Sequence, residues 1–215
     1  MKKTSLTLLF FITGLMSLQA KSIDLPDEKM HFDIPDDWVS SQVAGATFYA
    51  TNAENTTVCV LVSLPNDDQE GLDQPTFING FKDGMLKKMA GEGGTAQITH
   101  EGPLTIQGVP FYLYQGIFSK TDGKTLNFHA YATAVNGKIY SMVLESLDAN
   151  TDAQLEAVAN SLTFQGTPVL PDPSLRKDDR AEKYGQVVGY LIGLLAMVAI
   201  IRTILRRGRK NASAD

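Results

Sequence analysis

Two apolar segments lie near the ends of this chain, and the second is followed by Arg206, Arg207, Arg209 and Lys210. Apolar segments of this kind determine where a protein resides before its folded domain is considered, because long uncharged runs partition into lipid. The chain is therefore expected to consist of a folded middle part between two membrane-directed ends.

The first apolar segment is typical of a secretory signal peptide. Lys2 and Lys3 precede an apolar run over residues 6–18, and Ala20 is a small residue suited to signal peptidase. We predict that residues 1–20 form the signal peptide. An uncleaved anchor helix is the alternative, because Leu18 occupies the position two before Ala20, where a small residue is preferred.

The second apolar segment predicts a transmembrane helix over residues 184–205. Residues 185–201 are 17 positions without formal charge, and 185–205 are 21 positions. At ~1.5 Å per residue these 21 residues span about 31 Å, enough for a hydrocarbon core of ~30 Å. A buried helix of a soluble domain is the alternative, but the segment has no polar face.

Charge sets the expected orientation of this helix. The tail, residues 206–215, is basic, whereas the residues before the helix carry nearly balanced charges. The positive-inside rule places a basic tail in the cytoplasm. We therefore expect a single-pass protein of a bacterial cytoplasmic membrane, with its N-terminal domain outside, in the periplasm, and its C-terminus in the cytoplasm.

Three glycines recur at four-residue spacing in the predicted helix, at Gly185, Gly189 and Gly193. Glycines at this spacing let two helix backbones approach closely. The pattern predicts membrane-helix packing through this face, with a homodimer as one outcome.

The external part of the chain is strongly acidic. Residues 21–175 contain 8 Lys and no Arg against 20 Asp and Glu, a net charge of 8 − 20 = −12. Such a surface disfavours binding of nucleic acid or anionic lipid head groups through overall charge. Cationic partners or divalent ions are compatible with it, as is a surface that serves solubility alone.

Strands and two helices alternate in the middle of the chain. Helices are predicted from about residue 75 to 90, with Phe77, Ile78, Phe81, Met85 and Met89 on one side, and after a capping box formed by Thr151 and Gln154. Turn signals at residues 121–124 and 136–137 predict an antiparallel meander of three strands. The seven predicted strands cover residues 30–34, 46–51, 57–64, 97–106, 111–119, 124–135 and 138–147.

These elements make one domain over residues 24–165, large enough for its own core. Residues 166–183 contain Pro168, Pro171 and Pro173 followed by a charged stretch. They are expected to form a stiff linker that holds the domain away from the bilayer.

The chain resembles the PsbP-like superfamily, whose bacterial envelope members include the DcrB-type proteins. The resemblance covers about residues 30–165 and is carried by Ile34-Pro35-Asp36-Asp37-Trp38, Gly108-Val109-Pro110 and Ser161-Leu162-Thr163-Phe164. It implies an α+β fold, an α/β/α sandwich on a mainly antiparallel sheet, here followed by one C-terminal transmembrane helix. It also implies accessory or scaffold roles in membrane-associated assemblies and no shared catalytic residues.

One strand has a semi-polar face that is a candidate pocket. In residues 124–135, apolar residues alternate with Asn127, His129, Tyr131 and Thr133. We identify His129 and Tyr131, with Tyr112 and Tyr114 of the preceding strand, as the candidate pocket residues. The same face packed under a helix or exposed to solvent is the alternative.

Other chemistry finds little support. His31, His100 and His129 are far apart and lack neighbours at metal-ligand spacing, so no metal or cofactor is predicted. Residues 66–71 resemble part of a calcium loop, but Phe77 stands where the bidentate Glu is required, which leaves at most a weak calcium site. Cys59, the sole cysteine, lies in an apolar strand unsuited to a reactive thiolate.

Two functions of different classes follow. The preferred hypothesis is a membrane-anchored, non-enzymatic interaction or accessory module that binds envelope or membrane proteins. The alternative is a small-ligand binder or envelope enzyme that uses a pocket near His129.

Overall fold

A seven-stranded antiparallel sheet forms the centre of the protein. The computed structural model describes residues 20–91, 94–120, 123–148, 150–176 and 180–191. Within them the strand order of the large sheet is β3-β4-β5-β9-β8-β7-β6, and each neighbouring pair is antiparallel. Its strands are β3 (Val39–Ser40), β4 (Phe48–Thr51), β5 (Thr57–Pro65), β6 (Gly94–Ile106), β7 (Val109–Lys120), β8 (Thr125–Val135) and β9 (Lys138–Ser146).

The predicted meander is confirmed and extends to four strands, β6 to β9. The β8–β9 turn has Asn136 at φ 55° and Gly137 at φ 71°, and the β6–β7 turn repeats this pair with Gln107 and Gly108. Two consecutive positive φ angles define the tight hairpin turn whose twist matches that of the flanking strands. All seven predicted strands occur in the structure, with small shifts of their ends.

A second, three-stranded sheet has the order β1-β2-β10. It contains β1 (Ala20–Leu25), β2 (Met30–Pro35) and β10 (Thr163–Phe164), and the short helix η1 (Pro26–Glu28) joins β1 to β2. The sequence did not predict β1 or β10. Since β1 begins at Ala20, the folded part starts before the expected domain boundary at residue 24.

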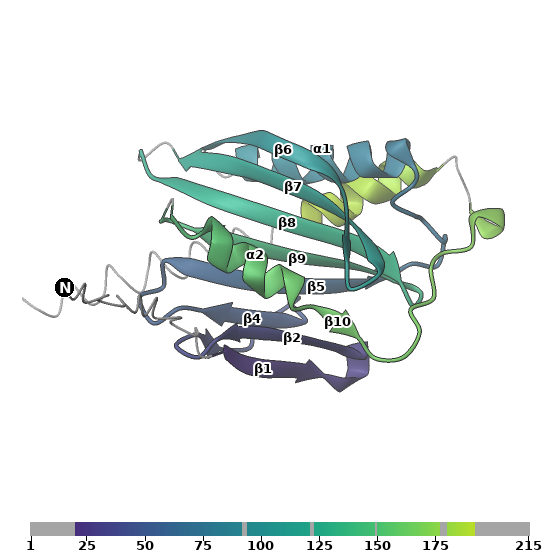
Figure 1. Cartoon of the computed structure of the whole chain (residues 1–215). Helices are drawn as coiled ribbons and strands as arrows, with labels where there is room; N and C mark the ends of the chain where they lie inside the picture. The colour runs from purple at the N-terminus through teal and green to yellow at the C-terminus, as the bar shows by residue number, and fades with distance from the viewer. Residues whose placement is uncertain (1–19, 92–93, 121–122, 149, 177–179, 192–215) are drawn as a thin grey trace, which may run out of the picture.

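Two labelled helices lie on opposite faces of the large sheet: α1 (Pro75–Gly91) behind it and α2 (Asp152–Asn160) in front of it (Figure 1). The predicted capping box of α2 is wrong. Thr151 already has helical angles, so its hydroxyl donates to the carbonyl of Asp148 at 2.8 Å and leaves the first turn without a side-chain cap. Its backbone carbonyl still accepts from the amides of Gln154 and Leu155.

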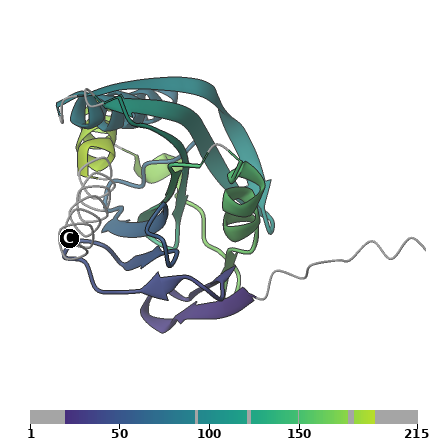
Figure 2. The same ribbon diagram turned by 90° about the vertical axis from the view of Figure 1, so that its left-hand side faces the viewer.

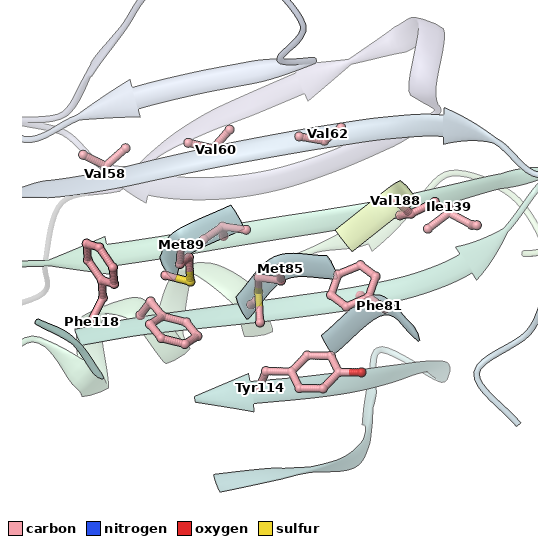
Figure 3. Packing of buried hydrophobic residues seen from close by; sticks show 14 of the residues in the cluster. Val58, Val60, Val62, Phe81, Met85, Met89, Tyr114, Phe118, Ile139 and Val188 are labelled. Carbon is pink, nitrogen blue, oxygen red and sulfur yellow. The ribbon is translucent and has the colours of Figure 1, made fainter. Parts of the chain in front are cut away.

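The central strands β5, β8 and β9 of the large sheet are buried on both faces, which produces two hydrophobic clusters. The α1 face holds Phe128 and the alternating alanines of β8 together with Phe77, Phe81, Met85 and Met89 of α1 (Figure 3). The α2 face holds Tyr131, Cys59 and Leu155 together with residues of the small sheet. The predicted apolar side of α1 and the predicted alternation along β8 are both confirmed.

The chain does not leave the domain after Gln165, as the expected linker would. Val169 and Asn136 exchange two hydrogen bonds, and the amide of Asp172 donates to the side chain of Gln69. Arg176 donates to both carboxylate oxygens of Asp73 and to the carbonyl of Gln69, and its side chain is 10% exposed. Residues 166–176, which include the short helix η2 (Pro173–Leu175), therefore lie against the domain.

A third helix follows, over residues 181–191, and we call it the C-terminal helix. It lies beside α1, on the side of the sheet opposite α2 (Figure 2). Its Ala181 and Val188 are buried in the α1-face cluster, so this helix belongs to the core of the domain.

Within the described residues, no helix combines the length and apolar character that a membrane crossing requires. The predicted signal peptide, apart from Ala20, lies outside the described residues, as do residues 192–205 of the predicted span, Gly193 and the basic tail. These remain predictions from the sequence.

We expect Phe128→Ala to lower the free energy of unfolding by about 3–5 kcal/mol, because it leaves a cavity in the α1-face cluster. The fluorescence of Trp38, the sole tryptophan and 1% exposed, can follow urea unfolding. Ile117→Ala on β7 is the control: Ile117 is 36% exposed, and its truncation should cost less than about 1 kcal/mol. Equal losses for the two variants would contradict this description of the core.

Candidate functional site

The four candidate pocket residues do not form one group. Tyr112 pairs with Ala132 and Tyr114 with Ala130, so both tyrosines point to the α1 face. His129 and Tyr131 point to the α2 face. The predicted grouping is therefore wrong, because directly paired residues share a face whereas successive residues of a strand alternate.

Tyr114 has a structural role under α1. Its ring stacks on Phe81 with centroids 5.4 Å apart, and its hydroxyl donates to the carbonyl of Ile78 at 2.9 Å. Burial raises the pKa of the Tyr114 hydroxyl, which stays protonated as a donor. Tyr114 thus fixes α1 on the sheet.

His129 is enclosed between the sheet and α2. Its side chain is 3% exposed, and its Nε2 lies 3.3 Å from a carboxylate oxygen of Asp152 at the start of α2. Its Nδ1 lies 3.4 Å from both the Tyr131 hydroxyl and the Gln115 amide nitrogen. Since that amide nitrogen can only donate, Nδ1 is an acceptor and Nε2 carries the proton that faces Asp152.

The enclosure of His129 favours its neutral form. Burial lowers the pKa of His129 below its ordinary value of 6.5, although the charges of Asp152 and Glu156 act in the opposite direction. A ligand could reach the ring only by displacing α2. The contact between His129 and Asp152 therefore helps to hold α2 against the sheet.

The remaining candidates for chemistry are dispersed. Among the described residues, no group of three His, Cys, Asp or Glu side chains is placed to hold a metal ion. His31 contacts Ser22 and Asp33 at the surface of the small sheet. Cys59 is buried, and burial raises the pKa of its thiol, which opposes formation of a thiolate.

The loop that resembles part of a calcium site is held by its own polar groups. The Asn66 side chain donates to the carbonyl of Glu70 at 2.8 Å and accepts from the Glu70 amide at 2.9 Å. Asn66 is nearly fully buried and is used for the backbone of the turn. It is therefore not directed outward as a ligand.

The backbones of α1 and the C-terminal helix approach each other closely at four glycines. Gly80 and Gly84 of α1 face the backbone of Glu182 and Gln186, and Gly185 and Gly189 face the backbone of Phe77 and Phe81. A methyl group at any of these four positions would overlap a carbonyl oxygen of the opposite helix. We call these four glycines the glycine seam.

Gly185 and Gly189 are thus packed inside the chain. The sequence predicted their close helix contact but assigned it to a membrane helix and a second copy. Gly80 and Gly84 lower the helix propensity of α1. Their shared four-residue spacing with Gly185 and Gly189 is the signal that pairs the two helices.

An open groove of about 640 Å³ lies along the outside of the glycine seam. Its apolar lining comes from Leu86 of α1 and from three residues of the C-terminal helix, Val187, Tyr190 and Leu191. Its polar lining comes from Lys87, Lys183, Asp83 and Gln186. We call it the seam groove and regard it, not the surroundings of His129, as the candidate functional surface.

The comparisons with known proteins identify the fold. No protein-family model matches the chain, and no curated protein matches it. The solution structure of cyanobacterial PsbP (CyanoP) from Synechocystis sp. PCC 6803 is similar to it with a TM-score of 0.59 and 13% sequence identity. The match covers 70% of this chain and 95% of that chain.

Two further structures match less well. A Bacteroides thetaiotaomicron protein gives a TM-score of 0.49 at 14% identity and covers 69% of this chain and 49% of its own. LpqN, described as involved in cell envelope biogenesis of Mycobacterium tuberculosis, gives 0.40 at 19% identity and covers 64% and 83%. The CyanoP match, with the antiparallel sheet between helices, shows that this chain has the PsbP-like fold, as the resemblance in sequence predicted.

We expect Gly84→Val to release the C-terminal helix from α1, because the new side chain would overlap the carbonyl of Gln186. Overpacking of this kind costs about 1–3 kcal/mol. Hydrogen exchange of the amides of residues 181–191 should become faster. Gly91→Val is the control, since nothing lies within 4 Å of a methyl group placed there. Unchanged hydrogen exchange of residues 181–191 in Gly84→Val would contradict the close packing of the two helices at the glycine seam.

We expect the protein to lose stability as the pH falls below about 6.5, in part through His129. Its folded-state pKa is lowered, so the unfolded chain binds the proton more readily and the stabilisation present above this pH is lost below it. His129→Gln should flatten the dependence of the urea midpoint on pH. Asp152→Asn should instead extend the loss to lower pH, because Asp152 raises the pKa of His129; identical profiles for all three proteins would refute this role.

Proposed function

We propose that this protein is a membrane-anchored, non-enzymatic interaction module of the bacterial envelope. A signal peptide directs its PsbP-like domain across the cytoplasmic membrane, and the apolar segment that continues the C-terminal helix retains it there. The domain presents its acidic surface to proteins of an envelope complex.

The glycine seam is the observation that carries this proposal. The C-terminal helix is the start of the predicted membrane segment, and it is packed into the core of the domain through Ala181, Gly185, Val188 and Gly189. Backbone-to-backbone contact leaves little freedom for the two helices to rotate or slide. The domain is thus mounted on its anchor as a rigid body, which suits a protein that positions a binding surface at a defined height above the membrane.

The closed surroundings of His129 favour this function over the ligand-binding or enzymatic alternative. His129 and Tyr131 are each 3% exposed, and the two tyrosines expected beside them lie on the other face of the sheet. The partner is a protein other than a second copy bound through the Gly185 and Gly189 face, because α1 occupies that face.

Photo-crosslinking in intact cells tests the proposal. A photo-reactive residue is placed at exposed positions of three regions: Glu156 on α2, His100 on β6 and Asp27 on η1. We expect at least one position to trap a specific membrane or envelope protein, whereas the same group at the buried Phe128 should trap none. Recovery of free monomer alone from all three positions would contradict an interaction module.

Membrane attachment is checked separately. The full chain should remain with the membrane after a carbonate wash, and a reporter fused after Asp215 should be cytoplasmic. Release by carbonate would contradict the anchor independently of any partner.

A further inference from the structure

The docked C-terminal helix leaves too little chain for a complete membrane crossing. Its tight contacts with α1 continue to Gly189, whose added methyl group would meet Phe81 and Met85. From Tyr190 to Leu205 there remain 16 residues (205 − 190 + 1), which as a helix span about 24 Å. A hydrocarbon core of ~30 Å needs about four residues more.

The missing length must come from the part of the helix that is docked on α1. The two helices run in the same direction, because Gly80 lies at Glu182, Gly84 at Gln186, and Lys88 at Tyr190. The last turn of α1 is therefore level with Tyr190, near the end of the described part of the C-terminal helix. If the seam stays closed, this end of the domain has to enter the membrane interface.

The side chains at this end are suited to an interface. Val187, Tyr190 and Leu191 are exposed by 49%, 44% and 37%, although they are large and apolar. The Lys88 ammonium lies 5.5 Å from the centre of the Tyr190 ring. Tyrosine is enriched at the level of lipid head groups, and lysine there extends its ammonium group toward the phosphates.

The charge of the seam groove is opposite to that of the domain. Lys87 and Lys183 line the groove with Asp83 as the one carboxylate among its lining residues, and Lys88 lies beside it. Residues 21–175 as a whole have a net charge of 8 − 20 = −12. The overall charge keeps the acidic surface off an anionic membrane, so any contact with it is confined to this end.

We propose that the seam groove and the last turn of α1 lie in the head-group layer of the bilayer and bind anionic phospholipid there. Lys87 and Lys183 bind the phosphates, while Val187, Tyr190 and Leu191 contact the upper acyl chains. The inference rests on the proposed membrane anchor and adds a lipid-binding surface to it. The domain sits directly on the bilayer, with its acidic remainder facing away.

A second copy of the chain fits the groove less well. A two-fold contact would bring the same groove, with the same lysines, against itself, and like charges across an interface are unfavourable.

The test uses the full chain in vesicles of neutral phospholipid, with or without anionic phosphatidylglycerol. A fluorescent group is attached at Val187→Cys, or at Asp27→Cys on η1 as a control. Cys59 does not compete for the reagent, because it is buried. Quenching by spin-labelled lipids then reports how close each position lies to the bilayer.

We expect strong quenching at residue 187 and none at residue 27. We also expect Lys87→Gln and Lys183→Gln to weaken docking on anionic vesicles, roughly fivefold in the docking equilibrium per lysine, whereas Lys29→Gln on the far side should have no effect. No quenching at residue 187 in a protein that resists carbonate would overturn the lipid site and leave the anchor intact. In anionic vesicles, quenching at residue 187 that is unchanged by both lysine substitutions would overturn the binding of anionic phospholipid, and energy transfer between labels of two copies would overturn lipid as the occupant of the groove.

Discussion

The large sheet has to be covered on both faces, and the rest of the structure follows from this requirement. Every residue of β8 from Phe128 to Val135 is buried, and only Thr125 and Asn127 near the start of the strand are not. A single 17-residue helix, α1, lies on one face of a sheet whose strands reach 13 residues. The C-terminal helix adds Ala181 and Val188 to that cover, while α2 and the small sheet cover the opposite face.

The glycine seam allows α1 and the C-terminal helix to lie side by side on the same face of the large sheet. Two helices that lie side by side on one sheet face compete for the same area, and ordinary side chains would hold their axes 8–10 Å apart. With glycines at each contact point the backbones meet directly, so both helices keep their apolar residues on the sheet. The low helix propensity of Gly80 and Gly84, about 1 kcal/mol each relative to Ala, is offset by this packing.

This packing also has a consequence for the proposed function. A domain on a free linker would sample many heights and orientations above a membrane. Here residues 166–176 follow the domain surface, Arg176 binds Asp73, and the next helix enters the core. The guanidinium of Arg176 keeps the pKa of the Asp73 carboxyl below its usual value, so this ion pair persists at neutral pH. The C-terminal helix and the rest of the domain surface are therefore fixed relative to each other, as the proposed function requires.

The sequence by itself determined β2 and six of the seven strands of the large sheet, all but the two-residue β3, together with α1 and the alternating faces of β8, because local periodicity and turn residues carry that information. It also showed the PsbP-like resemblance that the CyanoP structure bears out. Only the tertiary structure decided which backbone each glycine faces and on which face of the sheet each aromatic residue lies. Tyr114 and His129 are separated by strand register, and Gly84 and Gly185 by about a hundred residues of chain, so both relations depend on pairing between distant segments. Nearest-neighbour patterns carry no record of such pairing, which is why the predicted pocket was wrong and the seam was missed.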